Sequence, residues 1–301
     1  MTRFYKRATR LTVWRPRPSP VSPVGAFFEA AIPNAVQVDG LRVQFSISKS
    51  LGSDPNTCEI IVTNLAERTR AEFQDEPRKV ILEVGFDGEL MHLFSGDVSW
   101  AASVKNGSDW ETALQVRDGG RGYSNARVNR SYDRGTAAIT AIRECAAAFG
   151  LSLPPAVDRR PELQKQFAAG VVLAGKASDE LSRLLAPFNL GWSFQDGQLQ
   201  ILAAGDVRAG QAIVIEEGSG MIGSPSFQAP ASSRGKKAKR GTGSGPVLSV
   251  DTLLYPQIAP GGIVEVRGRN IHSQWKVRKV DHQGDSWGEA RTSIEAIEHG
   301  T

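Results

Sequence analysis

Residues 253–266 read LLYPQIAPGGIVEV, and residues 275–288 read WKVRKVDHQGDSWG. In the first segment a turn rich in proline and glycine leads into a strand, and in the second two strands flank the turn Gln283-Gly284-Asp285. Neither segment holds a nucleophile or a cluster of metal ligands. The motif is architectural, and it favours a part in a protein assembly over an enzyme.

The overall composition is that of a soluble globular protein. Of the 301 residues, 40% are hydrophobic and 23% are charged, which is enough apolar content for one large domain or a few small ones. No run approaches the roughly 18 apolar residues of a membrane span, and residues 1–7 lack the apolar core of a secretory signal. The two cysteines, Cys58 in an expected strand and Cys145 in an expected helix, are predicted to be buried free thiols.

The net charge of +4 is unevenly distributed. Of the 36 basic side chains, 11 lie in residues 1–28 and 218–250, which contain no acid, and this leaves 25 basic against 32 acidic side chains in the rest of the chain. The folded body is therefore mildly acidic, with two basic appendages. These basic segments could contact an acidic surface of another molecule, or they could simply be exposed to solvent. The candidate electrostatic contact residues are Arg234, Lys236, Lys237, Lys239 and Arg240.

The first 130 residues carry the alternating pattern of half-buried strands. Alternation predicts strands at 41–47, 58–62, 80–86, 90–94 and 110–116. Asp87-Gly88 and Asn106-Gly107 are hairpin signals, and Asn64 is predicted to cap a short helix over 65–70. Strands at this spacing indicate an antiparallel barrel or sandwich.

The pattern changes at Thr136. Apolar residues at helical spacing predict an amphipathic helix that ends at Gly150, and a second helix with Ser178 as its N-cap. Asp196-Gly197 predicts a small hairpin over 192–201. We therefore expect a mainly β fold with a small α+β insert. The expected division is 1–133, 134–204 and 205–301, the last with a basic flexible loop over 218–250 that is too poor in apolar residues to pack.

The chain shows no catalytic or cofactor motif. Residues 170–176 have the spacing of a phosphate-binding loop as far as Lys176, but Ala177 replaces the required Ser or Thr, so we predict a strand there. The four histidines lack metal-ligand spacing, and His282, beside Asp281, is expected to make a hydrogen bond that supports a turn. No enzyme activity, cofactor or metal is predicted.

Three stretches resemble the tail hub proteins of bacteriophages, the group that includes the baseplate hub of contractile tails and late-control-D-like proteins. Residues 40–45, Pro55-Asn56, 60–65 and Thr69-Arg70 are similar to the opening barrel of such hubs, and residues 178–201 resemble their small α+β insert. Residues 253–262 and 275–287 match the closing barrel. The basic loop 218–250 has no counterpart in that pattern.

The resemblance implies tandem tail-tube-like antiparallel β-barrels and a homotrimer, so that three chains present a ring of six barrels. Such a hub joins the hexameric tail tube, or a distal tail adaptor, to the central spike or tip protein, and it can contact the tape-measure protein. The implied location is the virion tail, with assembly in the host cytoplasm. The large side chains Leu254, Tyr255, Trp275 and Trp287 are expected to fill the second barrel's core.

Two other classes of function stay open at this stage. A tail-associated cell-wall hydrolase needs a catalytic domain for which no segment is left over. A nucleic-acid-binding protein would use the basic segments 1–17 and 234–240, although the acidic remainder of the chain argues against nucleic acid as the primary partner. No contact with a membrane is predicted.

Overall fold

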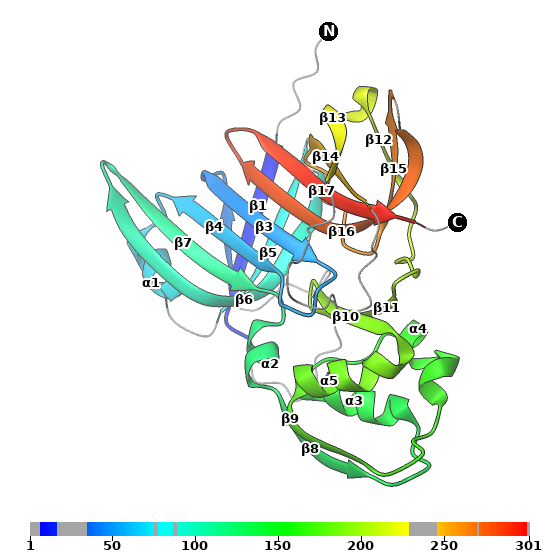
Figure 1. Ribbon diagram of the computed structural model, residues 1–301. Helices are drawn as coiled ribbons and strands as arrows, with labels where there is room; N and C mark the ends of the chain where they lie inside the picture. Colours follow the sequence, from blue (N-terminus) through cyan, green and yellow to red (C-terminus); the bar gives the residue numbers. More distant parts are fainter. Residues whose placement is uncertain are drawn as a thin grey trace.

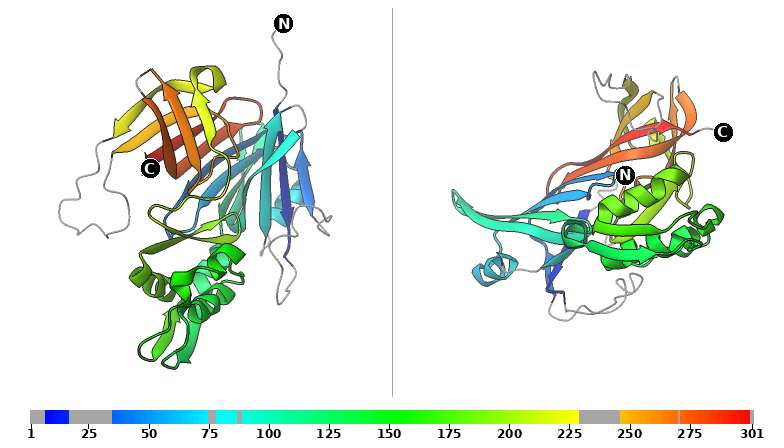
Figure 2. Two further views of the ribbon diagram at one scale, coloured as in Figure 1. Left: turned by 90° about the vertical axis from the view of Figure 1, so that its right-hand side faces the viewer. Right: turned by 60° about the horizontal axis from the view of Figure 1, so that its bottom comes forward.

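The protein's structure, a computed structural model, describes residues 7–16, 35–74, 78–86, 89–228, 246–269 and 271–299. One large sheet runs through two strand-rich regions, and a smaller body of helices and short hairpins lies at one end of them (Figures 1 and 2). This confirms the predicted mainly β class. The five candidate contact residues Arg234, Lys236, Lys237, Lys239 and Arg240 lie outside the described residues.

The large sheet has 13 strands, and its main path is β13-β14-β17-β16-β3-β4-β7-β6-β5-β1-β2. Neighbours pair antiparallel, except that β12 pairs parallel with β15. The path has two ends, so the described strands form a continuous sheet and no closed barrel. The strand bounds are β1 Arg7–Trp14, β2 Val36–Asp39, β3 Val43–Ser50, β4 Thr57–Thr63, β5 Lys79–Phe86, β6 Glu89–Asn106, β7 Asp109–Arg117, β12 Ile213–Glu216, β13 Met221–Gln228, β14 Val247–Leu253, β15 Ile263–Gly268, β16 Ile271–Asp285 and β17 Ala290–Glu298.

The first strand region buries the alternating side chains that the sequence marks as one face. In β3 and β4 every second residue is buried and the residues between them are more exposed, as a period of two requires. The short helix α1 (Glu67–Gln74) begins later than predicted. Asn64 does not cap it, because its backbone is left-handed (φ 59°) and its side-chain oxygen accepts the backbone N–H of Trp110 instead.

The smaller body has its own apolar cluster. Helix α3 (Ala138–Ala148) follows the predicted stripe, and Gly150 after it has φ 76°, the left-handed conformation that glycine adopts at no steric cost. Helix α5 begins at Ala177, so Ser178 is buried inside the helix and is not its N-cap. Helix α5 spans Ala177–Leu185, and the other α-helices and strands of this body are α2 Gly120–Asn125, β8 Arg127–Tyr132, α4 Pro155–Asp158, β9 Val171–Lys176, β10 Leu190–Gln195 and β11 Gln198–Ala203. It also has two 3-10 helices, η1 Pro161–Gln164 and η2 Ala186–Phe188.

Two expectations for this body are met in detail. Residues 171–176 form the predicted strand, paired with β8, and not a phosphate-binding loop. The hairpin β10–β11 turns at Asp196-Gly197, both with positive φ. The cluster also includes Ala126 and Val128, which precede residue 134.

The second strand region departs from expectation in several places. Trp275 is buried in the core of this region and Tyr255 packs against it, but Leu254 is buried in the core of the first strand region. Trp287 is 73% exposed because it lies at the tip of the β16–β17 hairpin. That turn falls at 286–289 and not at Gln283-Gly284-Asp285, which remain in strand β16. His282 therefore lies within a strand, and its Nδ1 shares a hydrogen bond with the Thr292 hydroxyl, which also accepts the backbone N–H of Tyr255.

The predicted flexible loop over 218–250 is wrong at both ends. Residues 221–228 and 247–253 form the paired strands β13 and β14. The physical reason is that Leu248 and Val250 alternate into the apolar core of this region, which also covers Met221. The strand pairing therefore compensates for the low apolar content of β13.

Gly284 lies where the two strand regions meet, and it leaves room for the ring of Phe45. A Cβ atom at position 284 would lie 2.5 Å from Cζ of Phe45 and 3.0 Å from Cβ of Ala290. We expect Gly284→Val to lower the free energy of unfolding by about 1–3 kcal/mol, the usual cost of overpacking. Urea unfolding checks this against Gln283→Val on the exposed face of the same strand. Equal stability of the two variants would count against tight packing at the junction.

Candidate assembly interface

Two sets of five strands repeat one pairing scheme, and we call them unit 1 (β3, β4, β5, β6, β7) and unit 2 (β13, β14, β15, β16, β17). In each unit the first two strands form a hairpin and the last three form a meander. In each unit the second hairpin strand pairs with the last meander strand. The chain therefore contains the same strand arrangement twice.

The pairing of the last two meander strands has a bulge at the same place in both units. Strand β6 has a bulge between Val98 and Trp100 where it pairs with β7, and β16 has one between Val277 and Lys279 where it pairs with β17. Five residues beyond Val98 lies Ser103, and five beyond Val277 lies His282.

The side chains at these matched positions make matching contacts. Ser103 bonds to the Thr112 hydroxyl at 3.0 Å, and His282 bonds to the Thr292 hydroxyl at 2.9 Å. Both threonines are fully buried. Since bulge, spacing and contact all coincide, Ser103 and His282 are equivalent positions of the two units.

The units join through β16 of unit 2 and β3 of unit 1, which pair antiparallel. At the centre of this junction His282 lies opposite Ile47, and both are buried, with Ile47 only 1% exposed. Backbone pairing and side-chain burial at this point make the sheet continuous from one unit to the next.

The equivalent edges at the two ends of the chain are unpaired among the described residues. Beyond Asp97, β6 is paired with β7 on one side, and no described strand pairs with its other side. Strand β13 pairs with β14 alone. These two edges carry large exposed apolar side chains, namely Trp100 (48%), Val104 (64%), Ile222 (45%) and Phe227 (54%).

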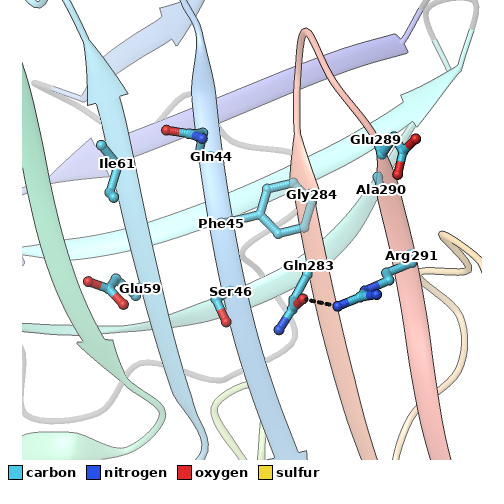
Figure 3. Close-up of a pocket in the computed structure, with 10 residues that line it drawn as sticks. All are labelled: Gln44, Phe45, Ser46, Glu59, Ile61, Gln283, Gly284, Glu289, Ala290 and Arg291. Atoms are coloured by element: carbon cyan, nitrogen blue, oxygen red, sulfur yellow. Dashed lines mark hydrogen bonds between the residues drawn. The ribbon is translucent and has the colours of Figure 1, made fainter.

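The outer face of the junction is an open groove of about 380 Å³, lined by both polar and apolar side chains (Figure 3). It crosses β4, β3, β16 and β17, and Figure 3 shows Arg291 hydrogen-bonded to Gln283 across two of these strands. Its charged side chains are Glu59, Glu289 and Arg291. The groove offers polar contacts from these groups and from the Ser46 hydroxyl.

A buried polar cluster fastens the hairpin β10–β11 to unit 1, and we call it the latch. Lys49 on β3 contacts the Asp196 carboxylate at 2.7 Å, and its side chain is only 4% exposed. Asp118, after β7, accepts the backbone N–H groups of Asp196 and Gly197, the latter at 2.8 Å. The Asp-Gly turn presents its N–H groups to a buried acid in this way.

Two groups in or beside the latch have strongly shifted pKa values. Burial, with a smaller effect from Asp196, raises the pKa of Asp118 to about 7. Burial, with a smaller effect from Lys49, lowers the pKa of His282 to about 3, although the Ile258 carbonyl and the carboxylates of Asp196 and Asp281 favour its protonated form. The Asp118 contribution to stability therefore falls as pH rises from about 4 to 7, and the His282 contribution falls as pH drops below about 6.5.

We expect the difference in stability between wild type and His282→Gln to depend on pH. As pH falls from 6 to 4 the unfolded chain binds a proton at residue 282 and the folded chain does not, so wild type should lose about 1.4 kcal/mol per pH unit relative to the variant. The Asp118 contribution is common to both proteins and cancels. Urea unfolding at several pH values measures the difference, and parallel curves for the two proteins would show that His282 is not held neutral.

The other residues that the sequence analysis considered do not come together in one site in the described part of the chain. Cys58 and Cys145 are buried free thiols, as predicted, and burial raises the pKa of Cys145 to about 12. Within the described residues no group of three His, Cys, Asp or Glu side chains could hold a metal ion, and no helix is long and apolar enough to span a membrane. Sequence reasoning missed the two free edges, and no local sequence signal marks them, because the exposure of Phe227 depends on which strands pair.

The comparisons with known proteins point to one group by fold. No model of a protein family and no curated protein matches this chain in sequence. Among solved structures, the chain is similar to the 43 kDa tail protein of prophage MuSo2 from Shewanella oneidensis, with a TM-score of 0.61, 13% identity, and coverage of 88% of this chain and 94% of that one. It is also similar to a tail protein from Neisseria meningitidis MC58, with a TM-score of 0.60, 11% identity and 98% coverage of both chains.

A third similar structure comes from a secretion apparatus. The Escherichia coli c3393 protein, a component of the type VI secretion system with structural similarity to the T4 bacteriophage tail proteins gp27 and gp5, matches with a TM-score of 0.54 and 11% identity. That match covers 86% of this chain and 74% of that one. The chain therefore has the fold of phage tail proteins over nearly its whole length, as the sequence resemblance implies.

Proposed function

We propose that the protein is the structural hub of a phage-type tail, a homotrimer that joins the hexameric tail tube to the central spike or distal tip. The observation that carries this proposal is the repeated pairing scheme of unit 1 and unit 2. Three chains with two equivalent units each present six similar units, which match a sixfold tube on one side. They keep a threefold axis for a spike on the other. The full-length likeness in fold to tail proteins supports the same role.

The layout of the chain fits a ring with two different rims. Figure 1 shows the tips of the β6–β7 and β16–β17 hairpins directed toward the upper left, whereas the smaller α+β body lies at the bottom. A ring of three chains would place six hairpin tips toward one partner and three α+β bodies toward the other. On this proposal, 1–133 and 205–301 supply the two tube-like modules of each subunit, and 134–204 supplies the insert.

Particles produced with and without this protein test the proposal. We expect particles that lack it to accumulate tail tubes without a joined spike or tip, and a gold-labelled affinity tag on the protein to mark the distal tail end in electron micrographs. Normal joined tails in its absence, or label along the tube or on the head, would contradict the proposal. Co-purification of peptidoglycan hydrolysis with the single chain would point to the hydrolase class instead.

A further inference from the structure

We propose that the free edge of β6 in one copy pairs with the free edge of β13 in a second copy of this chain, in the register of the internal β16–β3 junction. This inference rests on the proposed hub function and names the contact that closes its ring. Its basis is the equivalence of units: β6 corresponds to β16, and β13 corresponds to β3. The observed junction between the two units of one chain is therefore a template for the proposed junction between neighbouring chains.

The exposed side chains at the free edges correspond to buried positions at the internal junction. Phe227 lies opposite Leu248 in unit 2, and Ile47 lies opposite Cys58 in unit 1. Phe227 and Ile47 therefore occupy equivalent positions of the two units. Ile47 is 1% exposed and Phe227 is 54% exposed. The difference is what removal of the neighbouring strand would produce, since Ile47 has β16 beside it and Phe227 has no described strand there.

The register follows from the same equivalence. At the internal junction His282 pairs with Ile47 and Gln283 pairs with Ser46. Translated to the free edges, Ser103 pairs with Phe227 of the second copy and Val104 pairs with Ser226 of the second copy. The bulge over 223–225 falls beyond these pairs.

Pairing of these edges must occur between copies. Within one chain the sheet order places six strands between β13 and β6. In the folded chain these two strands do not pair with each other, and among the described strands each has a free side. A head-to-tail contact of this kind closes into a ring or grows into a filament, and it removes two strand edges that would otherwise invite aggregation.

Disulfide trapping tests the register. The full chain carries Val104→Cys and Ser226→Cys, is oxidised mildly, and is analysed without reductant; its mass in solution is measured in parallel by sedimentation. Residues directly opposite in antiparallel strands lie within disulfide range. The control pairs Trp100→Cys with Ser226→Cys, which moves one thiol four residues, or roughly 13 Å, along β6. The buried thiols of Cys58 and Cys145 do not interfere.

The outcomes separate the edge pairing from the hub function. We expect a covalent ladder that stops at three chains for Val104→Cys/Ser226→Cys and little product for the control. A trimer in solution with no cross-link, or with equal cross-linking of the control, would overturn the β6–β13 junction and leave the trimeric hub intact. A ladder that continues past three chains supports the junction and contradicts the closed ring. A monomer at every concentration contradicts both.

Discussion

Phe227→Asp is expected to prevent the protein from self-associating. At the proposed junction Phe227 passes from half exposed to buried, as Ile47 is at the internal junction, and large aromatic side chains of this kind dominate interface energies. An aspartate there would be buried without a partner, which costs several kcal/mol. We expect each junction to weaken by about 100-fold or more, equivalent to roughly 2.7 kcal/mol. Sedimentation over a concentration series measures the shift from trimer to monomer.

The control for this prediction is Val172→Asp, which introduces the same charge at an apolar residue of similar exposure (60%) on β9, away from both free edges. It should leave association unchanged. Because Phe227 also contacts the Trp275 ring, with centroids 5.8 Å apart, the folded state of each variant is checked by urea unfolding. A folded Phe227→Asp protein that still forms trimers would show that this edge is not the interface.

Lys49→Met is expected to be the most destabilising single change in the latch. Its side chain is 4% exposed, and it is the cation that faces Asp196 and lies near Asp118. Removal of one partner from a buried ion pair leaves an uncompensated charge and costs about 3–5 kcal/mol. Urea unfolding measures the loss. Hydrogen exchange should show that the amides of β10 and β11 lose protection first, because the latch holds that hairpin against unit 1.

Lys279→Met supplies the matched control. Lys279 forms a pair with Asp281 at 2.6 Å, but both side chains are about a third exposed, so its loss should cost about 0–1 kcal/mol. The double variant Lys49→Met/Asp196→Asn should recover part of the stability, since it removes the charge that Lys49 leaves behind. Similar small losses for Lys49→Met and Lys279→Met would mean that the latch ion pair contributes little.

Residue patterns in the sequence predicted the strands, helices and turns whose formation depends on nearby residues. Alternation identified β3 and β4 because one face of each strand is buried, and helical spacing identified α3 because its apolar stripe packs against one cluster. The Asp196-Gly197 turn was visible because few residue pairs suit its backbone. The strand β13 was missed because its pairing with β14, and not its own apolar content, holds it in the sheet.

The interface could not be predicted from the sequence for a related reason. The internal junction pairs β16 with β3, more than 220 residues apart, and no local pattern encodes such a pairing. The repeat is equally hidden, because equivalent positions hold different residues, as with Ser103 and His282 or Ile47 and Phe227. What the two units share is pairing and register, which only coordinates reveal. The exposure of Trp287 could not be predicted for the same reason, because it depends on the position of this residue at the tip of a hairpin.

A reconstruction of the native tail tip by electron cryomicroscopy tests the central claim most directly. It should show three copies of this chain in a closed ring of six strand units, with β6 of each copy paired to β13 of the next and Val104 beside Ser226. A ring with another number of copies, or a map in which these two edges face solvent, would contradict the account.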